Sequence, residues 1–195
     1  DQRSSMFFGS SHCFKSVLAA QLASLLAWSA LEAGDRVGGL VFNDAAHREI
    51  RLRRSRKTVL ALLSQVHEYN HSLPLDSGQA PESFADMLAN LRRIARPGSS
   101  IFLVSDFRGA ASEHAREHLF QLAQHTQLTA VACQDPVEVV LPRAGHYAVT
   151  NGSERSELDT ADRRLQQAYS DRSRQQQELL GREMLKLGIP LLRAN

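Results

Sequence analysis

The sequence predicts an α/β fold with a doubly wound, mostly parallel, Rossmann-like sheet. Through the first two thirds of the chain, segments with helical spacing alternate with short apolar runs rich in Val, Leu and Phe. Such alternation builds a parallel sheet through right-handed crossovers. The chain has 195 residues, of which 43% are hydrophobic and 23% charged, and this suits a single domain over 1–195 with a substantial core.

The first half contains three helices and two strands by this pattern. The expected elements are a largely buried helix over 14–31, a buried strand over 36–43, a charged edge strand over 48–54, a helix over 56–70 that Pro74 prevents from continuing, and a short helix over 84–91. The polar, turn-rich segment 73–83 joins the last two helices.

The second half begins with a fully apolar run over 100–107 that includes Ser105 and Asp106, as expected of a central strand whose carboxyl end opens onto a site. The expected elements after it are a helix over 112–125, a strand over 128–133, shorter strands over 135–142 and 145–150, a long polar helix over about 160–187 closed by Gly188, and a strand over 189–194.

Composition excludes several classes of protein. No apolar run reaches the roughly 18 residues of a membrane-spanning helix, and the first residues lack the order of a signal peptide. Cys13 and Cys133 lie among apolar residues, which predicts buried thiols and a cytoplasmic protein. No phosphate-binding loop, nucleophile elbow or dinucleotide fingerprint is present, so we expect no enzyme activity.

Four stretches carry a resemblance to a known family. They are DQRSSMFFGS at the start, LAWSALEAGDRVGGLVF, IFLVSDFRG, and DPVEVVLPRAG from Asp135. In this order they resemble domain of unknown function 58, which has a von Willebrand factor A-like fold and is often encoded beside MoxR-type AAA+ ATPases. The resemblance implies that the first strand of the fold precedes Asp1, so that this chain is the later part of a longer protein.

The same resemblance implies a degenerate metal-ion-dependent adhesion site. In von Willebrand A domains this site holds Mg²⁺ on an Asp-x-Ser-x-Ser motif and on a Thr and an Asp from two further loops. Asp1 and Ser5 match the first motif, Asp106 matches the third loop, and Glu82 or Ser83 lies near the Thr position. Arg3 replaces the first Ser, and a guanidinium has no lone pair for a metal. The expectation is therefore no cofactor or weakly bound Mg²⁺.

Arg3 suggests how such a site could work without a metal. We expect its guanidinium to pair with Asp1 or Asp106 and to take the electrostatic role of the metal. The alternative is that Arg3 points to solvent and the site still takes up Mg²⁺ weakly.

Two short patterns resemble zinc motifs. Residues 67–71 read HExxH and residues 114–118 read HxxEH. The first has no third ligand at a suitable spacing, and its histidines lie on the flank of a helix near its end. The second lies on an outward helix face, so we interpret both as solvated helix surface.

Arginine outnumbers lysine 20 to 3 in the chain, and six cations gather at Arg48, Arg51, Arg53, Arg54, Arg56 and Lys57. A solvated edge strand explains this cluster, and a docking surface for an acidic partner is the alternative. Nucleic acid is an unlikely partner because no aromatic side chains interleave the cluster.

These observations predict a non-enzymatic, protein-binding adaptor that acts with a MoxR-type AAA+ ATPase in protein assembly or remodelling. The expected binding residues are Arg3, Ser4, Glu82 and Arg108 at the carboxyl edge of the sheet, with Arg51 and Arg53 on the charged strand. Two alternatives stay open, namely a Mg²⁺-dependent hydrolase using the Asp1/Asp106 crevice and an arginine-rich nucleic-acid binder.

Overall fold

The computed structural model describes residues 1–72, 83–150 and 155–195. Its elements, in chain order, are a 3-10 turn at Ser4–Met6, α1 (Lys15–Glu32), β1 (Val37–Phe42), β2 (His47–Arg53), α2 (Arg56–His71), α3 (Phe84–Ile94), β3 (Ser100–Ser105), α4 (Glu113–His125), β4 (Gln127–Cys133), α5 (Pro136–Val139), β5 (His146–Thr150), β6 (Arg155–Asp159), α6 (Arg163–Lys186) and β7 (Leu191–Ala194).

The described strands form three small sheets instead of the one expected. β3, β4 and β7 make a parallel sheet in the order β3-β4-β7, while β1–β2 and β5–β6 are antiparallel pairs. The parallel part agrees with the sequence pattern. β4 lies in the middle of this sheet, and its last four residues, Ala130 to Cys133, are all buried.

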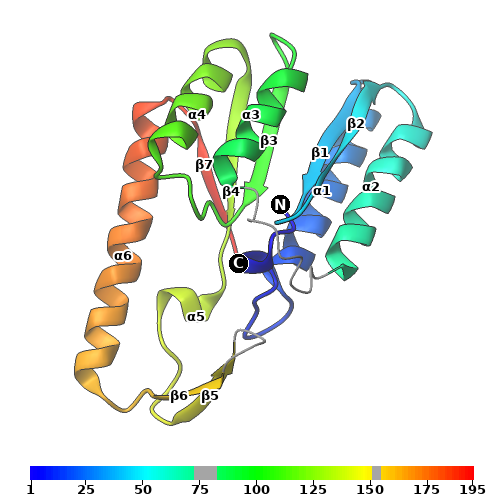
Figure 1. Ribbon diagram of the computed structural model, residues 1–195. Coiled ribbons are helices and arrows are strands. Elements are labelled where there is room, and N and C mark those ends of the chain that lie inside the picture. Colours follow the sequence, from blue (N-terminus) through cyan, green and yellow to red (C-terminus); the bar gives the residue numbers. More distant parts are fainter. Residues whose placement is uncertain (73–82, 151–154) are drawn as a thin grey trace.

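Helices lie on both faces of the strands (Figure 1). α3, α4 and α6 pack on one face of the parallel sheet, around Leu103, Leu128 and Ala130. α1 covers the opposite face, where Val104 and Val131 contact it, and also packs with α2 against β1. The result is a mixed α/β fold whose core lies on both sides of its strands.

The start of the chain lies between the β1–β2 pair and the parallel sheet (Figure 1). The nitrogen of Asp1 donates to the Val104 carbonyl of β3 (3.2 Å), and Gln2 N–H donates to the Phe42 carbonyl of β1 (2.8 Å). Two consecutive residues thus bridge strands that do not pair with each other. This arrangement carries Asp1 and Arg3 to the carboxyl end of β3.

Local sequence signals explain several helix starts. Ser55, Ser83, Ser112 and Asp162 each cap a helix with a side-chain oxygen, which satisfies backbone N–H groups that have no partner inside the helix. None of the described helices is long and apolar enough to cross a bilayer.

Besides the single sheet, three further expectations from the sequence are wrong. Residues 136–139 form α5 and no strand, because Asp135 and Glu138 make a capping box around Pro136. α1 is only partly buried: it packs against the parallel sheet and against α2 and β1, but leaves Leu25 68% exposed. Cys13 is exposed, because it lies in the loop before α1, whereas Cys133 is buried in β4 as expected.

Candidate functional site

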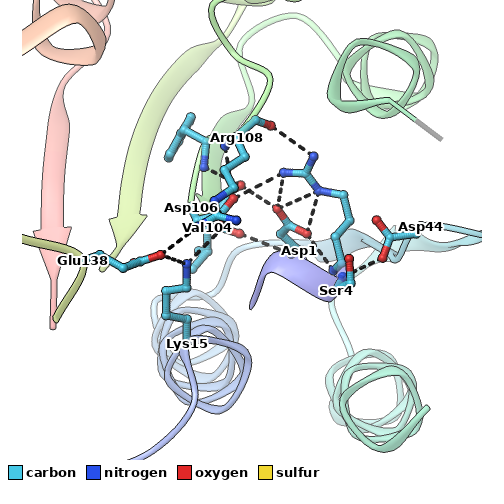
Figure 2. Close-up of polar contacts among 11 residues, drawn as sticks. Asp1, Ser4, Lys15, Asp44, Val104, Asp106, Arg108 and Glu138 are labelled. Carbon is cyan, nitrogen blue, oxygen red and sulfur yellow. Dashed lines mark hydrogen bonds and ion pairs between the residues drawn. The ribbon is translucent and has the colours of Figure 1, made fainter. Parts of the chain in front are cut away.

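Acidic and basic side chains from four parts of the chain meet at the carboxyl end of β3 (Figure 2). Asp1 comes from the first residues, Lys15 from the start of α1, Asp106 follows β3, and Glu138 lies on α5. Arg108 reaches over the same acids from the loop after Asp106. Parallel strands commonly place ligand sites at this edge.

Arg3 makes the contact with both acids that the sequence suggested. Its Nη2 lies 2.8 Å from Asp1 Oδ2 and 3.5 Å from Asp106 Oδ1, and its Nη1 donates to the Arg108 carbonyl (3.1 Å). The guanidinium also stacks over Phe84, with Cζ 5.0 Å from the ring centroid. Only 9% of the Arg3 side chain is exposed, so Arg3 does not point to solvent.

Lys15 is the second fixed cation of the site, and its side chain is 2% exposed. Its Nζ lies 2.8 Å from Glu138 Oε1 and 3.3 Å from Asp106 Oδ2 (Figure 2). A buried ammonium is tolerated only where it is paired with opposite charge and hydrogen-bonded. The two carboxylates supply that pairing, and they tie α1 to α5 and to the end of β3.

Arg108 is the exposed cation of the cluster. Its Nη2 lies 3.1 Å from Glu138 Oε1 and its Nε 3.5 Å from Asp106 Oδ2, yet 64% of its side chain is open to solvent. The acids Asp1, Asp106 and Glu138 thus face the cations Arg3, Lys15 and Arg108. We refer to these six residues as the charge-paired cluster.

The backbone beside Asp106 is strained. Phe107 has φ 57°, in the left-handed region that costs a non-glycine residue about 1–3 kcal/mol. Its N–H donates to Ser105 Oγ (3.0 Å), Ser105 Oγ donates to Asp1 Oδ2 (2.6 Å), and the Phe107 ring packs edge-on against Phe84. These contacts hold the turn that directs the side chains of Asp106 and Arg108 to the same side of the backbone, where they contact each other.

The pKa of Asp106 is lowered from its ordinary value. Burial alone would raise this pKa, but the nearby Lys15 ammonium, the Arg108 N–H and the Ser5 hydroxyl stabilise the carboxylate more strongly. Burial lowers the pKa of Arg3, and Asp106 opposes that effect. Asp106 therefore stays ionised and bound to its cations at neutral pH.

The predicted metal ligands differ in what their oxygens contact. Ser5 Oγ is buried near Asp106 and makes no hydrogen bond of normal geometry, so its lone pairs are available. Ser83 Oγ instead accepts from Asp86 N–H (3.2 Å) and donates to Asp86 Oδ2 (2.7 Å), which caps α3. Glu82 lies outside the described residues, and Ser4 donates its backbone N–H to Asp44 at the surface (2.6 Å).

As arranged here, the oxygens do not fit Mg²⁺. The Asp1 carboxylate accepts from the Arg3 side chain and from Ser105, and Asp106 faces Lys15 and Arg3. Octahedral Mg²⁺ needs several oxygens that no other group engages, and of the predicted ligands in the described part of the chain only Ser5 has a side-chain oxygen without a hydrogen-bond partner. Among described residues, no group of three or more His, Cys, Asp or Glu could hold a metal ion.

The arginines of the charged strand and the two histidine patterns lie outside the charge-paired cluster. Arg51 and Arg53 are exposed on β2, the outer strand of its pair, and make no ion pair with any described residue. The HExxH histidines lie at the exposed end of α2, where His71 Nδ1 is 2.8 Å from the His67 carbonyl. On α4, His118 Nδ1 accepts from the Arg92 side chain (2.8 Å).

Lys15 and Glu138 were missed from the sequence, although both left a signal. A lysine at the first position of a helix opposes the helix dipole, so its presence indicated a specific acidic partner. The order Asp135-Pro136-Val137-Glu138 is a capping-box pattern that predicts a helix start, and a helix there turns Glu138 toward α1.

Solved structures with the same fold come from two Bacteroides species. BatB from Bacteroides thetaiotaomicron, described as a conserved hypothetical protein, matches with a TM-score of 0.59 at 15% identity, over 100% of this chain and 87% of that one. An aerotolerance-related membrane protein from Bacteroides fragilis matches with a TM-score of 0.55 at 16% identity, over 100% and 88% of the two chains. These identities show a common fold alone.

Among curated proteins, none matches the sequence significantly. A family model described as "Protein of unknown function DUF58" matches residues 1–179. This span covers most of the chain and includes the whole charge-paired cluster. The chain therefore belongs to the DUF58 family, as the resemblance of its motifs predicted.

Proposed function

We propose that this protein is a non-enzymatic, cytoplasmic binding module of von Willebrand factor A type that recognises a protein partner without a metal ion. The partner class follows from the family resemblance, which associates such chains with MoxR-type AAA+ ATPases in protein assembly or remodelling. The fold shared with BatB is compatible with a doubly wound domain of this type.

The charge-paired cluster is the observation that carries the proposal. In a metal-dependent adhesion site, the cation neutralises the acids and leaves one position open for a partner's carboxylate. In this chain Arg3 and Lys15, at 9% and 2% exposure, neutralise Asp1, Asp106 and Glu138. Fixed ammonium and guanidinium groups thus occupy the electrostatic role of the metal.

Arg108 is the group that would meet the partner. Arg3 and Lys15 are buried and engaged by their acids, so they present few donors to a second protein. The Arg108 guanidinium is 64% exposed and has donors directed to solvent. A planar guanidinium binds a carboxylate through two parallel hydrogen bonds, and we therefore expect an acidic side chain of the partner at this position.

A binding assay with a MoxR-type ATPase encoded beside the gene tests the proposal. We expect wild-type binding to survive EDTA, and Arg108→Ala to weaken it about tenfold, as loss of a charge-assisted hydrogen bond predicts. Arg116→Ala is the matched control, because Arg116 is an exposed arginine on α4 that pairs with Glu183. Equal binding by the two variants, or binding abolished by EDTA, would contradict the proposal.

The competing function is a Mg²⁺-dependent hydrolase that uses the same crevice, where Ser5 Oγ has no hydrogen-bond partner among the described residues. Calorimetric titration with Mg²⁺ separates the two functions. Micromolar binding that Asp106→Ala removes, together with phosphatase activity, would establish the hydrolase. The adaptor predicts no saturable heat and no turnover at millimolar Mg²⁺.

A further inference from the structure

A surface groove is lined by one side of α6 and by β7. It has a volume of about 530 Å³ and is lined by Arg174, Gln177, Glu178, Gly181, Arg182 and Leu185 of α6 and by Arg193 of β7. Positions 174, 178, 181 and 185 share one face of the helix, since they are spaced by three and four residues. No part of the charge-paired cluster contributes to this groove.

The groove has an arginine-rich rim. Arg182 and Arg193 make no ion pair with any described residue, and Arg174 has only an exposed contact of 3.7 Å with Asp171. Glu178 is the single acid in the lining. Three guanidinium groups against one carboxylate favour a ligand that carries negative charge.

Apolar side chains are exposed both in the groove and on the other face of β7. Leu185 is 80% exposed in the groove, and Leu192, which points to the opposite face of β7 from Arg193, is 54% exposed. Gly181 lies in the lining, and a Cβ at this position would meet only Arg193 Nη2, at 3.9 Å, which is an ordinary contact distance. A larger side chain at position 181 would extend into the space beside Arg193, and replacing a glycine inside a helix does not by itself weaken the helix.

β7 also offers an unpaired backbone edge among the described residues. It pairs with β4 alone, and the carbonyls of Pro190 and Ala194 accept from β4 or from Gln134 just after it. Backbone groups alternate in direction along a strand. The N–H and C=O of Leu191 and Arg193 therefore point away from β4 at the free edge of this sheet, where an extended chain can pair with them.

We propose that the groove binds an extended acidic segment of a partner protein, which adds as a strand to the outer edge of β7. Strand addition takes its affinity from main-chain hydrogen bonds and its specificity from alternate side chains. On one face of the added strand, acidic side chains meet Arg193, Arg182 and Arg174. On the other face, apolar side chains pack near Leu192, because neighbouring residues of β7 point to opposite faces. The recognised sequence thus alternates acidic and apolar residues.

Fluorescence anisotropy with a labelled peptide of alternating Glu and Val residues tests this proposal on the whole chain. We expect micromolar binding, and a loss of about tenfold on Arg182→Glu or Arg193→Glu, in line with charge reversal at an interface. Arg172→Glu is the matched control, because Arg172 is an exposed arginine of α6 outside the groove lining. Equal losses of affinity in all three variants would show that binding depends only on the net charge of the protein, and this would overturn the proposal.

Two further arms test the geometry. A peptide of the same composition with its Glu residues in one block should bind at least about tenfold more weakly, because its acidic side chains no longer alternate with the apolar ones. A peptide N-methylated at the residues that face β7 should bind as weakly, because it has lost the backbone N–H groups that donate to β7. Gly181→Leu should block the peptide while it keeps or raises the melting temperature. Unchanged binding in these tests would overturn the proposal. So would sedimentation experiments in which the protein associates with itself through the same arginines.

Discussion

At the residue scale, the charge-paired cluster depends on Lys15, the most deeply buried of its cations. Its ammonium lies within 3.3 Å of both Asp106 and Glu138, and its side chain is 2% exposed. Removing one member of a buried ion pair is far more costly than its net contribution, because the opposite charges remain buried without a partner. The cluster is therefore expected to respond as a unit to single substitutions.

Lys15→Met should destabilise the fold by about 3 kcal/mol, because Asp106 and Glu138 lose the buried cation that they share and Glu138 keeps only the exposed Arg108, while a similar volume is kept. Urea denaturation measures the change. Lys57→Met is the control, since Lys57 is exposed at the start of α2, and it should change stability by less than about 0.5 kcal/mol. Equal effects of the two substitutions would show that the cluster contributes nothing to folding.

The lowered pKa of Asp106 predicts that the free energy of unfolding falls at acid pH. Its pKa is lower in the folded protein than the ordinary value of 3.8, so its ionised form stabilises the fold above that value. The contribution is lost as the pH falls through the folded-state pKa, because the unfolded chain binds the proton first. Between about pH 4 and pH 2, wild-type stability should fall more steeply than that of Asp106→Asn. Parallel slopes in thermal melts across this range would contradict the prediction.

The two thiols should differ in reactivity. Burial raises the pKa of Cys133 to about 11, whereas Cys13 is exposed. Thiolates are the reactive form, so a thiol reagent at pH 8 should label Cys13 alone in the folded protein and both cysteines in denaturant. Mass spectrometry of the labelled chain identifies the sites, and a Cys13→Ser variant that still labels quickly would contradict the assignment.

At the scale of secondary-structure elements, capping interactions decide several assignments that hydrophobic periodicity misses. The capping box of Asp135 and Glu138 makes residues 136–139 a helix, although their Val content favours a strand. In α6, Tyr169 Oη and Ser173 Oγ donate to the carbonyls of Val137 and Glu138, which holds one face of a polar helix against α5. Hydrogen bonds thus anchor the first part of α6, whereas Leu180 and Met184 in its later part pack into the core.

Ser83→Ala tests whether this serine caps α3 or serves a metal. The substitution should lower the stability by about 1 kcal/mol, because Ser83 Oγ accepts from Asp86 N–H in the capping box. Ser64→Ala, at an exposed position inside α2, should cost nothing. A fall in Mg²⁺ affinity without a loss of stability would instead identify Ser83 as a metal ligand.

At the scale of the whole molecule, the described strands fall into one central parallel sheet and two peripheral pairs. β4 has a strand on each side and helices on both faces, and Ala130, Val131, Ala132 and Cys133 are buried. The β5–β6 pair has no second neighbour among the described strands and contributes no residue to the three buried apolar clusters. The free energy of local unfolding should therefore be higher for β4 than for the β5–β6 pair.

Hydrogen exchange checks the division directly. Amide protons of β4 should exchange with protection close to that of global unfolding, and those of β6 at least about 100-fold faster, because small two-stranded pairs open easily. Mass spectrometry of proteolytic fragments resolves the two strands. Equal protection would mean that the β5–β6 pair unfolds only with the core.

The sequence by itself determined the α/β class, most element positions and the family, because hydrophobic periodicity, caps and motifs are local in the chain. It also identified Asp1, Arg3 and Asp106, since each lies in or beside a recognisable motif. Only the tertiary structure decided that Lys15 and Glu138 join them. These two residues are 123 positions apart, and local patterns carry no information on which distant charges meet once a helix start and a capping box turn them together. The same holds for the α6–β7 groove, whose arginines come from a helix and from a strand edge that only folding brings side by side.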